Sequence, residues 1–250
     1  MPTWAHDFWL EAHPFYTDKG QQVDVSIHVG NHFVGDSLPN IVSWYTDFNV
    51  FDKEDINQVE GEMGRDPAGY FTPEKNGTYA IGYQSTFSYV EIFPDTFNKY
   101  LRDEGLDNAI AYREQHQQQR AMGKENYIRH CKLLVQAGNG YEVDTSGLNL
   151  GYELEIIPQQ NPYRLKPGDQ LDLKIIYQNK PAEGLLLIAF SKSMPEQEQR
   201  IRTDTNGIAR LTLDHAGPWL AKVVKIIKIE DDKVDWQSHW ASLTFALRNQ

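Results

Sequence analysis

The last hundred residues of the chain carry short stretches of alternating apolar and polar residues, and a turn signal closes each of them. The stretches recur at a spacing of about ten residues, which is typical of the strands of a β-sandwich. They run over residues 171–177, 185–190, 208–213, 218–227 and 242–247. Alternation with a period of two buries one face of a strand, and Gly, Pro, Asn and Asp between the stretches favour turns. We therefore predict an all-β sandwich over residues 151–250.

The first ninety residues show the same kind of strand signal. Residues 23–29 alternate between valine or isoleucine and other residues, and residues 78–93 contain two further strand-like stretches. Glycines mark the turns between them. These signals predict a β-rich N-terminal part over residues 1–93.

The pattern changes at Pro94. Residues 95–105 have the spacing of an amphipathic helix that stops at a glycine, and residues 106 to 122 predict a second helix. Strand character then returns. We therefore predict a mainly β fold, in which two immunoglobulin-like β-sandwich parts are joined by a short helical segment. The predicted division of the chain is 1–93, a helical bridge returning to strand over 94–150, and 151–250.

Charge and composition exclude several classes of protein. The chain has 24 Lys and Arg against 35 Asp and Glu, a net charge of -11, which argues against binding of nucleic acid. Cys131 is the sole cysteine, so neither an intrachain disulfide nor a thiolate zinc cluster can form. No apolar stretch reaches the roughly 20 residues that span a bilayer, so we expect membrane contact to be peripheral at most. The sequence lacks nucleophile-elbow, metalloprotease and phosphate-binding motifs, and we expect no enzymatic activity.

The first residues of the chain allow two interpretations. Thr3-Trp4-Ala5 has the small–x–small spacing that signal peptidase cleaves, and His6 follows it. If residues 1–5 are the remnant of a signal peptide, His6 becomes the N-terminal residue, and its α-amine and imidazole can bind one metal ion. In the other interpretation, residues 1–5 are an ordinary start and His6 opens a β-strand.

Strand phase distinguishes the histidines. His28 lies on the polar side of its strand, so we expect it to be exposed. His28 and His32 are about 13 Å apart in a regular strand, so only a bend at Gly30-Asn31 would let them share an ion. His6 and His239 share phase with the apolar residues of the first and last strands, and each is either a packing residue or a ligand that faces a core.

The C-terminal part resembles the carboxypeptidase-regulatory-like and transthyretin-like sandwiches. The resemblance rests on Lys180-Pro-x-x-Gly184, on Thr203-Asp-x-x-Gly207-x-x-x-Leu211, and on a strand that follows Gly217-Pro218-Trp219. It implies a sandwich, in agreement with the periodicity.

Nearly the whole chain resembles a large family of bacterial exported proteins. The opening motif His6-Asp-Phe-Trp-Leu-Glu11 and the closing motif Asp235-Trp-x-Ser-x-Trp-Ala-Ser-Leu-Thr-Phe245 are specific in combination. Further segments that follow the family pattern are 29–39, 82–85, 97–105, 162–169 and 217–219. Members are described as the periplasmic component of cobalt and nickel uptake systems, and otherwise as domains of unknown function.

The resemblance implies a signal peptide cleaved just before His6, a periplasmic location and a role in metal uptake. It also implies a β-rich fold with an immunoglobulin-like C-terminal part. One position departs from the pattern, because Lys225 stands in a strand where relatives often carry a histidine. If that histidine is a ligand in relatives, this member would bind another metal, bind weakly, or not bind.

Our leading hypothesis is a non-enzymatic periplasmic protein that binds nickel or cobalt and passes the ion to a membrane metal transporter. Imidazole and amine donors suit these ions, and they also suit copper and zinc. The candidate ligands are His6, Asp7, His32 and His239.

Two other hypotheses remain open. One is a metal-free β-sandwich interaction module that binds a surface protein or a glycan, which a solvent-exposed row of aromatic residues would favour. The other is a copper-dependent oxidative enzyme that uses N-terminal His6 and a partner histidine, and it requires a flat substrate face around His6.

Overall fold

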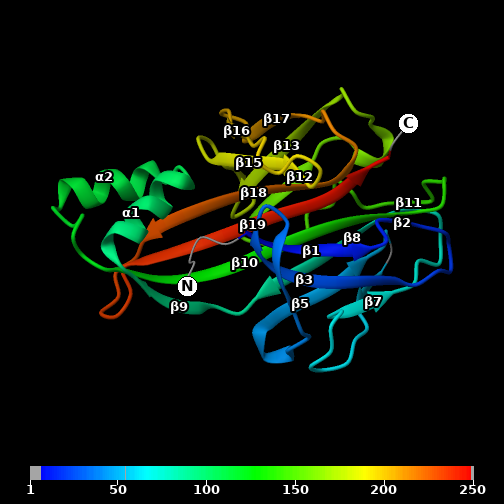
Figure 1. The fold of residues 1–250 in the computed structure, drawn as a ribbon, viewed down its shortest axis with the longest axis horizontal. Helices are drawn as coiled ribbons and strands as arrows, with labels where there is room; N and C mark the ends of the chain where they lie inside the picture. The colour runs from blue at the N-terminus through cyan, green and yellow to red at the C-terminus, as the bar shows by residue number, and fades with distance from the viewer. Residues whose placement is uncertain (1–6, 54, 249–250) are drawn as a thin grey trace.

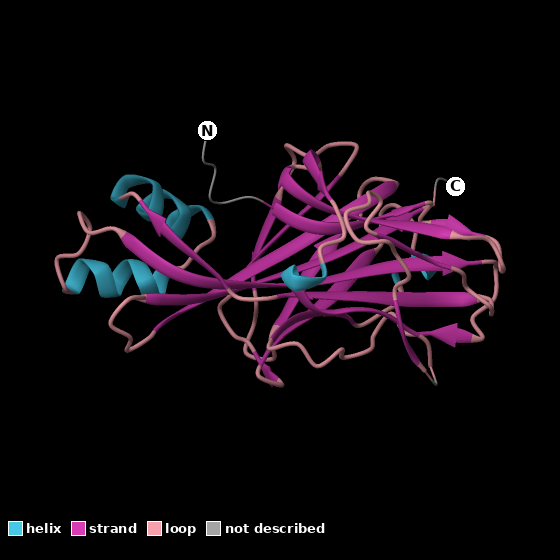
Figure 2. Cartoon of the chain, turned by 90° about the horizontal axis from the view of Figure 1, so that it is seen from below, coloured by secondary structure: helices cyan, strands magenta, loops and turns pink. Residues whose placement is uncertain are grey.

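The computed structural model describes residues 7–53 and 55–248, and it is mainly β, as the sequence predicts. Its strands form three sheets, and two short α-helices lie together at one end of the molecule (Figure 1). Most strands run along the length of the molecule toward or away from the helical end (Figure 2).

The largest sheet has eleven strands and receives strands from all three predicted segments of the chain. Its main order is β16 (Gln199–Arg202), β15 (Leu186–Ser191), β18 (Gly217–Lys228), β19 (Trp236–Leu247), β10 (Gly123–Ala137), β8 (Gly77–Ser85), β5 (Tyr45–Phe51) and β6 (Ile56–Gln58). Three further strands pair beside this path, namely β2 (Tyr16–Thr17), β9 (Ser88–Ile92) and β11 (Val143–Asp144).

Each of the two smaller sheets has four strands. The first comprises β1 (Asp7–His13), β3 (Val23–Asn31), β4 (Val34–Leu38) and β7 (Gly69–Phe71). The second comprises β12 (Leu154–Pro158), β13 (Gln170–Tyr177), β14 (Lys180–Pro181) and β17 (Ile208–Thr212). Two single turns of 3₁₀ helix lie at Val42–Trp44 and Pro162–Arg164.

Strand β10 joins the two halves of the chain. It pairs in parallel with the last strand, β19, from Glu125 opposite Trp236 to Leu133 opposite Thr244. Its other edge pairs with β9 at the start and with β8 at the end. One continuous sheet therefore supports both β-rich parts of the molecule.

Because side chains alternate along β10, this strand contributes residues to two cores on opposite faces of the sheet. Cys131, Leu133 and Val135 pack with β1 and β3 of the first small sheet. Leu134, between them, packs with β12, β13 and β17 of the second small sheet. Because successive residues of a strand point to opposite faces, one strand can belong to two sandwiches at once.

The helical segment consists of α1 (Pro94–Asp103) and α2 (Asp107–Gln115), which pack on the ends of β9, β18 and β19. The first helix ends near Gly105, as predicted. The second ends at Gln115, before the predicted residue 122, and Gln117 just beyond it has a φ of 55°, which a helix cannot continue through. No helix among residues 7–53 and 55–248 has the length and apolar character needed to cross a membrane.

Strand β1 is buried on both faces, which sets the environment of the site described next. Phe8 and Leu10 point into the core shared with β8 and β10. Trp9 points the other way and packs with Phe33 and with the aliphatic residues of β15. Glu11 shares the face of Trp9, so its carboxylate lies inside the protein and is only 4% exposed.

Candidate metal centre

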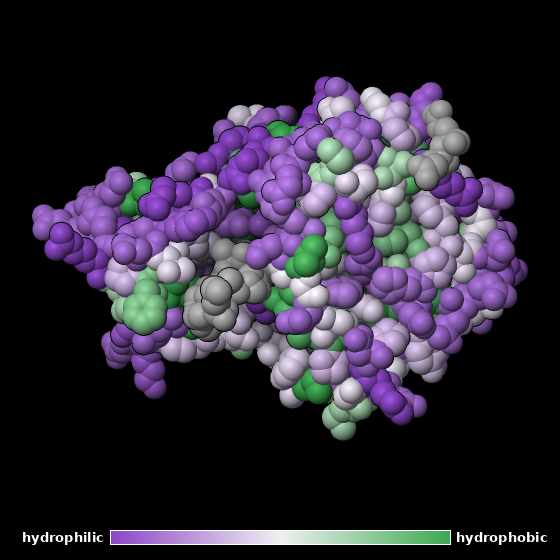
Figure 3. All heavy atoms as spheres, in the orientation of Figure 1, coloured by the Kyte–Doolittle hydropathy of each residue, from purple (hydrophilic) through white to green (hydrophobic). Residues whose placement is uncertain are grey.

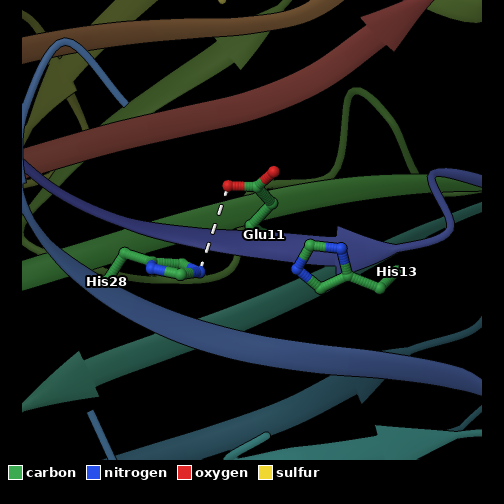
Figure 4. Close-up of side chains that lie close together, drawn as sticks. All are labelled: Glu11, His13 and His28. Carbon is green, nitrogen blue, oxygen red and sulfur yellow. Dashed lines mark ion pairs between the residues drawn. The ribbon is translucent and has the colours of Figure 1, made fainter. Parts of the chain in front are cut away.

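Glu11, His13 and His28 come together on the first small sheet. Glu11 and His13 are two residues apart on β1 and therefore share a face. Strand β3 runs antiparallel to β1 with His28 opposite Trp9, so His28 lies diagonally across from Glu11. One ligand atom from each of the three side chains lies within 4.8 Å of the other two (Figure 4).

The carboxylate of Glu11 is held in place by two other side chains. Its Oε2 accepts a hydrogen bond of 3.3 Å from Nε1 of Trp9. Its Oε1 accepts a hydrogen bond from the ammonium of Lys192, which comes from the end of β15. These contacts fix the position of the carboxylate.

His28 presents a buried nitrogen to this carboxylate. Its ring stacks on Trp9 with a centroid separation of 5.1 Å and an interplanar angle of 14°. Its Nε2 is 4.0 Å from Oε2 of Glu11 and has no hydrogen-bond partner within the described part of the chain. A buried polar atom without a partner is costly, and a bound ion or an ordered water is among its explanations.

The protonation state of His28 suits a metal ligand. Burial lowers the pKa of His28, and the charge of Glu11 only partly offsets this effect. The imidazole is therefore neutral at neutral pH, and a neutral imidazole is the form that binds metals.

The three groups differ in their access to solvent. Glu11 is buried, His28 is partly buried with its side chain 19% exposed, and His13 is exposed. Metal–ligand bonds of about 2.0–2.2 Å require the three atoms to draw closer than they are here. Because His13 is exposed, its side chain can turn toward the other two without disturbing the core.

Two imidazoles and one carboxylate form a donor set for a divalent transition metal. Imidazole suits nickel, copper, zinc and iron, and a carboxylate adds the negative charge that a dication favours. Only three such groups meet here among the residues that the structure describes. An ion bound to them would therefore have coordination positions open to water or to an incoming ligand.

The predicted ligands Asp7 and His32 lie together, at the far end of β1 from His13. Oδ2 of Asp7 accepts a hydrogen bond of 2.9 Å from the backbone N of His32. Oδ1 of Asp7 lies 2.7 Å from Nζ of Lys222. The carboxylate of Asp7 is thus occupied by an ion pair and a backbone hydrogen bond.

The imidazole of His32 is paired with two glutamates. Its Nε2 is 2.9 Å from Oε1 of Glu198, and its Nδ1 is 3.3 Å from Oε1 of Glu196. Burial alone would lower the pKa of His32, but the hydrogen bond and charge of Glu198, with the charge of Glu196, raise it. The imidazole of His32 is therefore positioned to pair with carboxylates.

The chain between His28 and His32 does not bend as the sharing of an ion would require. Gly30 and Asn31 stay within β3, and the reversal occurs one step later, where His32 and Phe33 have φ values of 52° and 63°. Two successive residues with positive φ are typical of a tight hairpin turn. The prediction that His28 is exposed is wrong, because its ring packs on Trp9 and its side chain is only 19% exposed.

The predicted ligand His239 lies elsewhere. It is fully buried on the apolar side of the last strand, and its Nδ1 is 3.2 Å from Nε2 of His130. It faces Tyr177 of β13, whereas Asp7 reaches Lys222 on the opposite face of the large sheet. His6 lies outside the described residues.

Sequence reasoning missed His13 and did not single out Glu11 as a ligand. The available signal was the Glu-x-His spacing on the first strand, because residues two apart in a strand share a face. The part played by His28 depends on the register of β1 against β3, which the sequence pattern does not reveal.

Comparisons with known proteins give one family and several weak structural likenesses. The family described as "Domain of unknown function (DUF4198)" matches residues 3–226. No curated protein sequence matches the chain.

Among solved structures, the D0-D1 domain of intimin is 13% identical with a TM-score of 0.22, and the alignment covers 95% of this chain and 97% of that one. Three N-terminal domains of the bacteriophage RB49 outer capsid protein Hoc are 8% identical with a TM-score of 0.22, covering 98% and 71%. Dimeric latent PorU from Porphyromonas gingivalis is 8% identical with a TM-score of 0.21, covering 97% and 20%. Likenesses at this level carry no argument about function.

Proposed function

The chain belongs to the DUF4198 family of domains of unknown function, and we propose that it is a non-enzymatic metal-binding protein. In this proposal Glu11, His13 and His28 capture a divalent transition metal, nickel or cobalt first, with copper or zinc as alternatives. The protein then passes the ion to a membrane uptake system.

The observation that carries this proposal is the buried Nε2 of His28. Nothing in the described protein satisfies this atom, and it faces the Glu11 carboxylate rather than an apolar core. Buried side-chain polar atoms usually have a hydrogen-bond partner, so this unpartnered nitrogen needs an explanation. A metal ion between Nε2 and the carboxylate would satisfy both groups.

The arrangement also suits a protein that transfers its bound ion to another carrier. The exposed His13 leaves the site open to solvent on one side, and three protein ligands leave room for a ligand from the next carrier. Transfer by ligand exchange needs such an open position. A structural metal site, in contrast, is usually closed by four protein ligands.

The choice of metal, location and partner rests on the sequence resemblance. Raw affinity order would favour copper at any site of nitrogen and oxygen donors, so the identity of the ion in the cell depends on which metal is supplied. The opening motif after Thr3-Trp4-Ala5 supports export to the periplasm, and the resemblance to cobalt and nickel uptake components supports a transporter as partner.

Calorimetric titration of nickel, cobalt, copper and zinc into the wild-type chain and His28→Gln tests the proposal. We expect binding in the wild type and a loss of tenfold or more, about 1.4 kcal/mol, in His28→Gln. His116→Gln is the matched control, because His116 is an exposed histidine at the end of α2. Equal binding in wild type and His28→Gln would refute this site.

A form that begins at His6 separates the contribution of the N-terminus. If it binds more tightly than the full chain and His28→Gln has no effect, the ligands include the N-terminal amine and imidazole instead. If neither form binds any of the four metals, the metal-binding function is wrong.

A row of exposed aromatic residues supports the alternative function as an interaction module. Phe87, Tyr89 and Phe93 lie along β9 and its flanks, and each is at least 50% exposed. On the face drawn in Figure 3, however, hydrophobic side chains form small separate groups rather than one wide patch. A glycan array probed with wild type and Tyr89→Ser tests this alternative, which requires binding that the substitution abolishes.

A further inference from the structure

We propose that Lys192 competes with the metal for Glu11. The ammonium of Lys192 holds the Glu11 carboxylate until an incoming ion displaces it. This inference rests on the proposed function of the Glu11, His13 and His28 site. It assigns a role in setting affinity to a residue that is not itself a ligand.

The first support is the position of the ammonium. Lys192 Nζ contacts Oε1 of Glu11, while the other oxygen, Oε2, accepts the Trp9 indole N–H and faces His28. An ammonium is a hard cation with three donors and no lone pair, so it competes with a metal for a carboxylate but cannot join it as a ligand. Two cations at one carboxylate repel each other, so the Lys192 ammonium at Oε1 would oppose a metal at Oε2.

The second support is that the ammonium can leave without moving the backbone. The backbone N of Lys192 donates a hydrogen bond of 2.8 Å to the carbonyl of Pro218, which fixes the start of the loop after β15. The side chain itself is 41% exposed, and it reaches inward along the ring of Phe33, whose centroid is 5.4 Å from Nζ. Rotation of this long side chain would carry the charge into water.

The third support is the charge balance of the site. Without a metal, buried Glu11 is paired with the ammonium of Lys192, which orients the carboxylate. When a dication binds and Lys192 leaves, the ammonium regains water. When the ammonium of Lys192 returns to Glu11, it would promote dissociation of the metal, which gives the protein a route to release the ion.

Lys192→Met tests this role, because methionine keeps an unbranched apolar stem and removes the charge. We expect the variant to bind nickel about tenfold or more tightly than the wild type, since a competing charge in direct contact is gone. Lys228→Met is the matched control, because Lys228 is 30% exposed and pairs with Asp235 at 3.6 Å, away from the site. The control should bind as the wild type does.

The outcomes separate this inference from the function on which it rests. If no variant and no wild-type protein binds metal, the proposed function fails and the inference fails with it. If the wild type binds and His28→Gln does not, but Lys192→Met binds no more tightly than the wild type, the function stands. Lys192 is then a structural partner of Glu11 and the inference is overturned.

A measurement on the wild type covers the case in which Lys192→Met does not fold. Amine acetylation followed by mass spectrometry reports the reactivity of each lysine with and without nickel. We expect saturating nickel to increase the acetylation rate of Lys192 and to leave Lys228 unchanged. An unchanged or slower rate at Lys192, with nickel bound, would overturn the inference.

Discussion

His130 and His239 face each other across the parallel strands β10 and β19, with Nε2 of His130 3.2 Å from Nδ1 of His239. Their rings are 7° from parallel, and both side chains are buried. One shared proton satisfies these two nitrogens, so the pair is stable when both rings are neutral. Burial, with the charge of His239, lowers the pKa of His130 to about 3, and burial lowers the pKa of His239 as well.

We expect acid to destabilise the protein through this pair. In the unfolded chain His130 takes up a proton near its ordinary pKa of 6.5, whereas the folded protein resists this down to about pH 3. The stability that the neutral ring contributes is complete above pH 6.5 and is lost as the pH falls toward 3, because the unfolded state binds more protons. In urea unfolding at several pH values, His130→Gln should show a weaker pH dependence over this range than the wild type. An equal dependence in the two proteins would contradict the assignment, and His116→Gln serves as the exposed control.

Glu125 should give the stability of the folded protein the opposite pH dependence. It is buried beneath α1, and it accepts hydrogen bonds from the hydroxyls of Ser238 and Tyr100. Burial raises its pKa from 4.5 to about 7. The folded protein therefore keeps the proton more strongly than the unfolded chain, and this contribution is complete below pH 4.5 and lost as the pH rises through 7.

Glu125→Gln isolates this effect, because glutamine has the same shape and stays neutral. We expect the variant to gain stability over the wild type as the pH rises from 5 to 8, and the melting temperature at each pH measures the gain. A difference between the two proteins that does not change with pH would show that Glu125 is ionised throughout.

Lys132 of β10 and Glu155 of β12 form a buried ion pair, with Nζ 2.5 Å from Oε1 and both side chains 2% exposed. Removal of one partner leaves a buried charge without compensation, which costs about 3–5 kcal/mol. We therefore expect Lys132→Met to lose about that much unfolding free energy in urea titrations. The double variant Lys132→Met, Glu155→Met should recover part of the loss. A double variant as unstable as the sum of the two single variants would mean that the ions are not coupled.

The sequence pattern predicts local features of this fold well, because period and turn chemistry act over a few residues. The strand over residues 23–29, the first helix and the inward orientation of His239 all follow from it. The pairing of β10 with β19 does not, because these strands are a hundred residues apart and their register is set by packing. For the same reason the sequence identifies Asp7 and His32 as candidates but not the diagonal pair of Glu11 and His28, which exists only in one register of β1 on β3.

We expect Trp9 to raise the metal affinity of the proposed site through its indole N–H. The indole donates to Oε2 of Glu11 at 3.3 Å and stacks on His28, so it orients two of the three proposed ligands. Trp9→Phe keeps an aromatic ring against His28 but removes the hydrogen bond, and loss of such an orienting contact typically lowers metal affinity by about 10–100-fold. We expect nickel affinity to fall within that range in calorimetric titration. Trp219→Phe is the control, because Trp219 is equally buried and donates its N–H to the carbonyl of His215 in another core. If both variants bind nickel as the wild type does, Trp9 only packs, and the Glu11 carboxylate holds its position without the indole.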